Sequence, residues 1–259
     1  MDELTFPLLV AAAMSMAVLA FCGVRCWIRK RRQARLRWVG GRMGLHRAYH
    51  PGESLEDIWR EQFLLLGGER KKVGHGVENL LQGYVEGRQV YLFDFEETIV
   101  HETNVWQSVL VIKSGGQGWP RFALHPRKSK KERFTRRLRT AVQEFASRGI
   151  AGYRRAGVRI EGYRLSCPSG SEHQVRDLFN AELIQYFSSH RQFALEGSNG
   201  FLLLYRRERL VAPGNLEAFM RDALSIHRLL LTAVNPDGGR QSSLSFRPGA
   251  GRVPSGHVL

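Results

Sequence analysis

The chain opens with a long apolar run followed by a cluster of positive charge. Leu4–Val24 holds 21 residues without a charge, and seven Lys or Arg residues lie within Arg25–Arg37. The hydrocarbon core of a bilayer needs roughly 20 apolar residues of helix, and basic residues beside a span tend to stay on the cytoplasmic side. We therefore predict a transmembrane helix over residues 4–28, with residues 1–3 outside the cell and the remainder in the cytoplasm.

A cleaved signal peptide is the alternative interpretation of this region. A signal peptide carries its positive charge before the apolar run, whereas here Asp2 and Glu3 precede the run and the basic residues follow it. The pattern favours an uncleaved, single-pass anchor in an inner or plasma membrane. The predicted cationic flank of the anchor consists of Arg29, Lys30, Arg31, Arg32, Arg35 and Arg37.

Residues 29–53 are predicted to form a basic juxtamembrane linker. Gly40, Gly41 and Gly44 follow the cationic flank, and glycine permits backbone conformations that other residues avoid. We expect these glycines to form a flexible joint between the membrane and the globular domain.

Beyond the linker, the pattern predicts a first β-rich unit over residues 54–150. Ser54 and Asp57 suggest a capping box for a short helix that extends to Leu66. Strands are predicted over 79–85, 88–98, 105–112 and 121–124, and the Glu86-Gly87 turn makes the first two a hairpin. Together these strands predict an antiparallel meander.

The first unit ends in an amphipathic helix, predicted over residues 130–147. Apolar side chains recur there at helical spacing, from Phe134 to Phe145. Positive charge dominates the opposite face and the residues just before it: Arg127, Lys128, Lys130, Lys131, Arg133, Arg136, Arg137 and Arg139. Three interpretations stay open for this surface: an ordinary solvated face, a face that contacts the inner leaflet, or one that binds an acidic protein or nucleic acid.

A second unit containing α and β structure is predicted over residues 151–234. A strand at 160–167 and a helical region at 171–189 precede a hairpin around Asn199-Gly200, and a helix follows at 215–233. The fold class is therefore α+β: a transmembrane helix, then antiparallel hairpins with packed helices in two β-containing units. Residues 235–259 are rich in Gly, Ser, Pro and Arg, and we expect a disordered tail.

The sequence resembles a group of uncharacterised, single-span membrane-anchored bacterial proteins. The resemblance rests on 76–83 (GVENLLQG), 90–96 (VYLFDFE), 106–109 (WQSV), 120–126 (PRFALHP), 162–165 (GYRL), 175–179 (VRDLF) and 202–206 (LLLYR). These segments span roughly Trp59 to Leu231. The group has no assigned activity, so the resemblance implies an anchored domain and transfers no reaction, cofactor or site.

Charge and cysteine content agree with a cytoplasmic domain at a membrane. The net charge is +15, and without the seven basic residues of Arg25–Arg37 and the acids Asp2 and Glu3 it is still +10. A basic domain tethered to a cytoplasmic leaflet is attracted to anionic headgroups. Three cysteines are too few for a disulfide framework, which is typical of a reducing compartment.

One cluster offers candidate chemistry for an enzyme. Asp94 and Glu96 share one face of a predicted strand, and His101 follows nearby. Two carboxylates and an imidazole suit acid–base catalysis or a divalent metal, although a strand end also exposes such charges to water without any function. No zinc-ligand spacing, phosphate-binding loop or GxSxG motif occurs, so we expect no metal and no cofactor.

The sequence as a whole predicts a non-enzymatic, membrane-anchored interaction module. Its partner would be anionic lipid or an acidic protein, and nucleic acid is disfavoured because no aromatic-interleaved RNA-binding motif or helix-turn-helix spacing accompanies the basic residues. The alternative is a membrane-tethered hydrolase or metal-dependent enzyme that uses Asp94, Glu96 and His101.

Overall fold

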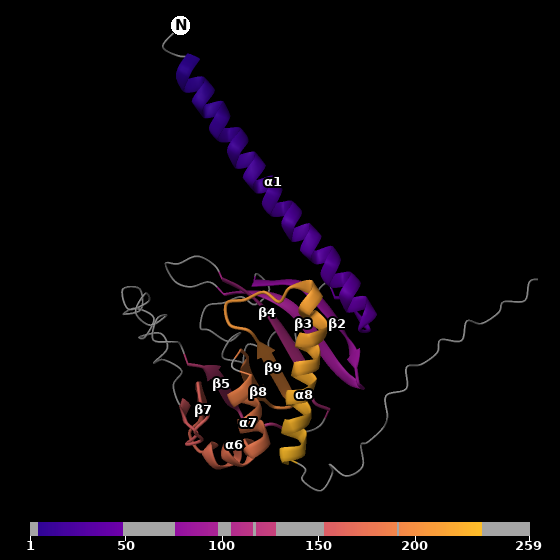
Figure 1. The fold of residues 1–259 in the computed structure, drawn as a ribbon, viewed down its shortest axis with the longest axis vertical. Coiled ribbons are helices and arrows are strands. Elements are labelled where there is room, and N and C mark those ends of the chain that lie inside the picture. The colour runs from indigo at the N-terminus through magenta and orange to yellow at the C-terminus, as the bar shows by residue number, and fades with distance from the viewer. Residues whose placement is uncertain are drawn as a thin grey trace, which may run out of the picture.

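A long N-terminal helix joins a domain built on one antiparallel sheet (Figure 1). The computed structural model describes residues 5–48, 76–97, 105–115, 118–127, 153–190 and 192–234. The predicted α+β class is confirmed. The predicted helices at 54–66 and 130–147 and the tail at 235–259 lie outside the described residues.

Helix α1 (Thr5–Arg42) is a single continuous element of 38 residues. At 1.5 Å per residue it is about 57 Å long, which exceeds the roughly 30 Å hydrocarbon thickness of a bilayer. It contains a stretch long and apolar enough to cross a membrane, and none of that stretch is buried against the domain. Among the described residues, nine of the twelve exposed large apolar side chains lie on α1, as expected for a membrane anchor.

The strands of both predicted units belong to one sheet. Their order across the sheet is β1-β2-β3-β4-β9-β8-β5-β7-β6, and every neighbouring pair is antiparallel. The strands are β1 (Leu45–Arg47), β2 (Val77–Val85), β3 (Arg88–Glu97), β4 (Val105–Lys113), β5 (Phe122–Pro126), β6 (Tyr153–Arg155), β7 (Tyr163–Pro168), β8 (Ala194–Ser198) and β9 (Phe201–Tyr205). Pairing of β4 with β9 joins the two units into one sheet, so they share a core.

Both predicted hairpin turns are confirmed. Glu86 and Gly87 have φ values of 51° and 74°, and they join β2 to β3 with Val85 opposite Arg88. Asn199 and Gly200 have φ values of 43° and 82° and join β8 to β9. Positive φ at both central residues gives a turn whose twist matches the twist of the flanking strands. The short edge strands β1 and β6 were not predicted, because three residues leave no periodic pattern.

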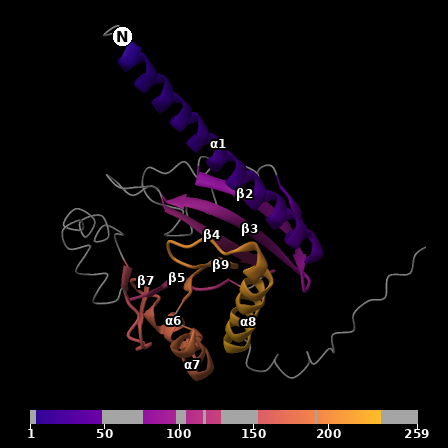
Figure 2. The same ribbon diagram turned by 45° about the horizontal axis from the view of Figure 1, so that its top comes forward.

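Helices cover one face of this sheet (Figures 1 and 2). The helical region predicted at 171–189 is two helices, α6 (Glu172–Leu178) and α7 (Ala181–Ser189), because Asn180 between them caps α7 by accepting a bond from the Leu183 amide. A single turn of 3-10 helix, η1 (Pro213–Asn215), leads into α8 (Leu216–Val234). The buried side of α8 packs with Leu92, Leu110 and Leu204 in the larger core cluster.

The C-terminal part of α1 also belongs to this core, which corrects the predicted linker. Residues 29–42 continue the helix, and Leu36 and Val39 are buried in the same cluster as α8. A Cβ at Gly40 would lie 2.7 Å from Leu81 Cδ1, so this glycine allows α1 to pack closely on β2. The predicted flexible joint is wrong because packing outweighs the weak helix propensity of Gly40 and Gly41.

A buried polar network holds α8 against the β2–β3 hairpin. His227 of α8 is fully buried, and its Nδ1 accepts a bond from Arg88 at the start of β3. Because arginine only donates, the imidazole carries its proton on Nε2 and donates to Ser114 Oγ, which also accepts from Trp119 Nε1 at 3.3 Å. Burial, reinforced by Arg88 and Arg228, lowers the pKa of His227 to about 3.

We expect this histidine to make the domain sensitive to acid. The folded state keeps His227 neutral, whereas the unfolded chain protonates it near its ordinary pKa of 6.5. The unfolded state therefore binds more protons below that pH, and the free energy of unfolding falls by up to about 1.4 kcal/mol per pH unit between about pH 6.5 and 3. Unfolding of the full chain in detergent at several pH values measures this slope.

The matched pair for this test is His227→Gln and His173→Gln. His173 is 85% exposed on α6, so its replacement removes a histidine without disturbing the buried network around His227. His227→Gln should flatten the slope between pH 6.5 and 5. Equal slopes in the three proteins would show that His227 is not held neutral by the fold.

Candidate functional site

The polar residues of interest gather where α1 meets the sheet. Asp94 lies on β3, on the face that α1 and α8 cover, between Leu92 and Glu96. Its side chain is only 4% exposed, and a buried carboxylate is costly unless cations and hydrogen-bond donors surround it. The helix supplies the cation: Arg32 reaches down from α1 to this carboxylate.

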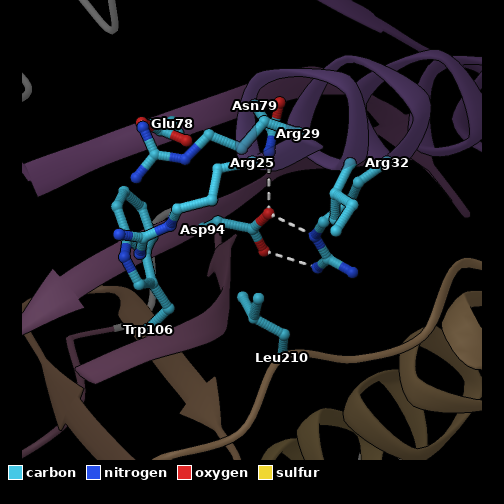
Figure 3. Close-up of a pocket in the computed structure, with 9 residues that line it drawn as sticks. Arg25, Arg29, Arg32, Glu78, Asn79, Asp94, Trp106 and Leu210 are labelled. Atoms are coloured by element: carbon cyan, nitrogen blue, oxygen red, sulfur yellow. Dashed lines mark hydrogen bonds and ion pairs between the residues drawn. The ribbon is translucent and has the colours of Figure 1, made fainter. Parts of the chain in front are cut away.

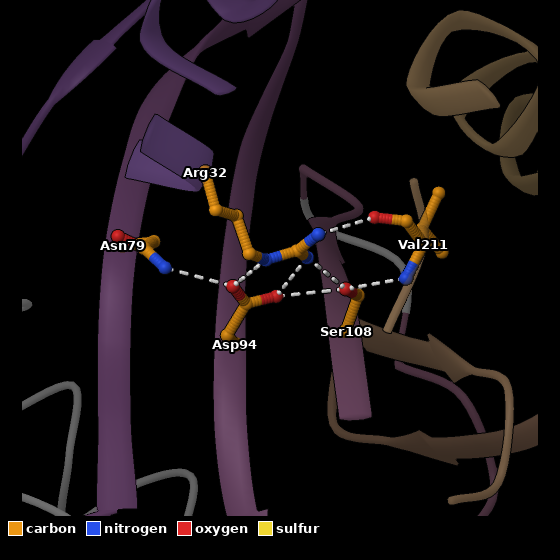
Figure 4. A network of polar contacts seen from close by, with 5 residues as sticks. All are labelled: Arg32, Asn79, Asp94, Ser108 and Val211. Atoms are coloured by element: carbon orange, nitrogen blue, oxygen red, sulfur yellow. Dashed lines mark hydrogen bonds and ion pairs between the residues drawn. The ribbon is translucent and has the colours of Figure 1, made fainter. Parts of the chain in front are cut away.

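The ion pair has the two-pronged geometry that arginine and carboxylate prefer (Figure 4). Arg32 Nε donates to Asp94 Oδ2 and Nη2 to Oδ1, both at 2.8 Å. Nη1 donates to the Val211 carbonyl at 2.8 Å, so the same guanidinium also holds the segment before η1. One side chain thus joins α1, the sheet and the entrance to α8.

Two neighbouring strands complete the shell around Asp94. Ser108 lies opposite Asp94 on β4, donates to Oδ1 at 2.7 Å and accepts from the Val211 amide at 2.9 Å. Asn79 on β2 donates to Oδ2 at 2.8 Å. Asn79 sits at a β-bulge with φ 57°, a conformation that asparagine tolerates, and the bulge aims its amide at Asp94. Each carboxylate oxygen therefore accepts two bonds.

This shell argues against the alternative role for Asp94, in an acid–base or metal-binding cluster with Glu96 and His101. Asp94 and Glu96 do share one face of a strand, but Asp94 has its donors from the protein itself and belongs to a structural junction. His101 lies outside the described residues. No local pattern in the sequence marks this pairing, because Arg32 is 62 residues away and resembles its cationic neighbours.

A cavity of about 220 Å³ opens beside the ion pair, on the side where α1 leaves the domain (Figure 3). We name it the junction cavity. Its lining combines three helix arginines, apolar side chains and two carboxylates: Arg25, Ile28, Arg29, Arg32, Glu78, Asn79, Asp94, Trp106 and Leu210. In Figure 3, Trp106 and Glu78 lie on one side of Asp94 and Arg32 on the other.

The arginines in the cavity differ in how firmly they are held. Arg32 is 17% exposed and fully engaged with Asp94, whereas Arg29 is 56% exposed, 3.6 Å from Glu78 and 5.5 Å from the centre of the Trp106 ring. Partial burial, with Asp94 and Glu96 nearby, raises the pKa of Glu78 although Arg29 opposes this shift. Arg25 stacks on Phe21, within α1 itself, at 5.5 Å.

The predicted cationic flank is thus divided by its contacts. Arg29 and Arg32 turn toward the domain, and Lys30, Arg31, Arg35 and Arg37 are exposed. Of the second predicted surface, Arg127 is described: it is exposed just after β5, and its amide donates to the Gly162 carbonyl at 2.7 Å. The other members, from Lys128 to Arg139, lie outside the described residues.

A second polar cluster joins three adjacent strands on the opposite face of the sheet. The buried Glu196 of β8 accepts from Tyr205 of β9 at 3.1 Å and lies 3.2 Å from His125 Nε2 of β5. No local pattern in the sequence predicts this cluster, because its three members are distant in sequence. Within the described part of the chain, no group of three or more His, Cys, Asp or Glu residues is placed to hold a metal ion.

Comparison with known proteins shows a similarity of fold. No protein-family model matches the chain, and no curated protein sequence does. Among solved structures, the crystal structure of the mycobacterial trehalose monomycolate transport factor A, TtfA, matches with a TM-score of 0.53. The match covers 80% of this chain and 96% of TtfA at 13% identity. At that identity the likeness concerns the fold alone.

We expect the Arg32–Asp94 pair to contribute more to the free energy of unfolding than any other ion pair described for α1. Asp94→Asn leaves a largely buried guanidinium without its counter-charge, and we expect the free energy of unfolding to fall by about 3 kcal/mol. Arg32→Gln should lower the free energy of unfolding by a similar amount. The double variant should lose distinctly less than the sum of the two single losses. Denaturant unfolding of the full chain in detergent gives the four values.

Arg29→Gln is the matched control for this cycle. It removes the same kind of charge from the same helix, but its pair with Glu78 is half exposed, so the loss should stay below about 1 kcal/mol. Additive losses at Arg32 and Asp94 would contradict a coupled ion pair.

Proposed function

We propose that this chain is a membrane-anchored, non-enzymatic interaction module whose domain is held rigidly at the cytoplasmic surface of the membrane. The observation that carries the proposal is the continuity of α1, which runs from its exposed apolar part into the domain core. A flexible linker would let the domain move freely. A helix packed through Leu36, Val39 and Arg32 instead presents one side of the domain to the headgroups.

The site supports a binding role better than catalysis. The Asp94 carboxylate already accepts four hydrogen bonds, so it is a poor metal ligand or general base. The fold is shared with a protein described as a transport factor, which agrees with a non-enzymatic role. The alternative, an enzyme that uses Asp94, Glu96 and His101, would first have to break the contact that anchors α1.

As partner we propose anionic lipid headgroups of the inner leaflet, with an acidic protein as the second candidate. The cationic residues from Arg127 to Arg139 would form this surface, because each well-placed cation near an anionic leaflet contributes about 1 kcal/mol. Tethering adds to this: a domain that α1 already holds at the membrane loses little further freedom on contact.

The first test is topology. The seven basic residues after the apolar run support a cytoplasmic domain through the positive-inside rule. A cytoplasm-active reporter fused after Val234 in a bacterial host should therefore be active, and a periplasm-active reporter at the same site should be silent. The reverse pattern would overturn the proposed side of the membrane.

The second test is contact between the cationic surface and lipid. A fluorophore is attached to Ser129→Cys in the full chain, with Cys22 and Cys26 changed to Ser, and the protein is placed in nanodiscs that carry a headgroup quencher. We expect stronger quenching with anionic than with neutral lipid, and we expect added salt to remove the difference. Arg133→Glu, Arg136→Glu and Arg137→Glu together should abolish it.

The control reverses three exposed arginines on other elements: Arg164 of β7, Arg176 of α6 and Arg221 of α8. The change in net charge is identical, so a general electrostatic effect would lower the quenching equally in both variants. Contact through the residues from Arg127 to Arg139 would be refuted if quenching did not depend on lipid charge. It would also be refuted if both triple variants lost quenching equally.

A further inference from the structure

We propose that the junction cavity binds the headgroup of one anionic phospholipid from the membrane that α1 crosses. The phosphate lies between Arg25 and Arg29, and the first part of an acyl chain contacts Ile28, Trp106 and Leu210. The inference rests on the proposed membrane function, since it needs the domain to sit at the membrane surface. It adds a defined site and a stoichiometry of one lipid per chain.

The position of the cavity along α1, relative to the hydrocarbon core, points to a lipid as its occupant. Arg25 is the first charged residue after the uncharged run Leu4–Val24, and Arg32 lies seven residues, or about 10 Å, further along α1. The headgroup layer on each side of the hydrocarbon core is roughly 5–8 Å thick. When the apolar run fills the core, the cavity therefore opens at the level of the phosphates.

The charges favour an anion. The charge of Arg32 is balanced by Asp94, and Arg29 makes only a loose contact with Glu78. Among the described residues, no carboxylate forms an ion pair with Arg25. A phosphate between Arg25 and Arg29 would gain two charge-assisted contacts beside a low-dielectric wall, where such contacts are stronger than in water.

The apolar lining of the cavity favours a lipid over a simple anion as the occupant. Ile28 and Leu210 are 54% and 41% exposed, and Leu210 is one of three exposed large apolar side chains described outside α1. Trp106 lies beside them on the cavity wall, and tryptophan is enriched at membrane interfaces because its ring suits both apolar and polar surroundings. Inorganic phosphate would leave these surfaces in water, whereas a phospholipid covers them.

Native mass spectrometry of the full chain in a neutral detergent tests the site. The protein is titrated with phosphatidylglycerol or with phosphatidylcholine of the same acyl chains. We expect one tightly retained phosphatidylglycerol and little phosphatidylcholine. The pair Arg25→Gln and Arg29→Gln should weaken retention by roughly tenfold or more, because both phosphate contacts are lost. Glu78→Gln should strengthen it, because Arg29 is released from a competing carboxylate.

The matched control is the pair Lys30→Gln and Arg31→Gln. It removes the same charge from the same helical turn, but neither residue lines the cavity, so retention should change less than about twofold. If both double variants lost lipid retention equally, the proposal of a defined site would be overturned, and the retention would be explained by surface charge alone. Displacement of the lipid by millimolar inorganic phosphate would overturn the proposal that a phospholipid is the occupant and would assign the cavity to a soluble phosphate.

Failure of the lipid site can be distinguished from failure of the proposed function, because different measurements report the two. Contact of the Arg127–Arg139 surface with lipid is read from a fluorophore outside the cavity, and the topology is read from reporters. Loss of the cavity site with quenching intact would leave an anchored module without a bound lipid. Failure of the topology and quenching tests, with one lipid still retained, would leave a lipid site on a domain of different orientation.

Discussion

The attachment of α1 to the sheet depends above all on one contact, the ion pair between Arg32 and Asp94. It joins α1 to the central strands of the sheet and, through Val211, to the start of α8. Among the described helices, α1 is the one that is long and apolar enough to cross a membrane. Because both groups are largely withdrawn from water, neither is stable without the other. The apolar contacts of Leu36 and Val39 then fix α1 along the sheet, and the junction cavity exists because the helix is held there.

Much of the fold was predictable because its signals are local. Glu86-Gly87 and Asn199-Gly200 specify their turns through backbone conformation alone, and the spacing of apolar residues in α8 reports a buried face directly. The division at Asn180 was harder, since a capping side chain has to be recognised within an otherwise helical pattern. Strands β1 and β6 owe their existence to their neighbours and have no pattern of their own.

The candidate site was less predictable because its members meet only in three dimensions. Arg32 is one of seven similar charges, and nothing in its surroundings in the sequence distinguishes it from Arg31 or Arg35. Asp94 looked like part of a catalytic cluster because its nearest neighbours in sequence are acidic, whereas its partners come from α1, β2 and β4. Likewise Gly40 suggested flexibility, and only the proximity of Leu81 explains why it is a close-packing position.

The unbroken helix also fixes an angle. Successive residues of an α-helix are turned by about 100° around its axis. Each face of the apolar part of α1 therefore has a fixed direction relative to each face of the domain. Adding one residue between the apolar run and Arg29 would leave composition and length almost unchanged, yet it would turn the domain by more than a quarter of a circle. The helix and the domain would also share one tilt. In a bilayer thin enough to tilt α1, the domain would tilt with it, so bilayer thickness would affect which surface of the domain lies nearest the membrane.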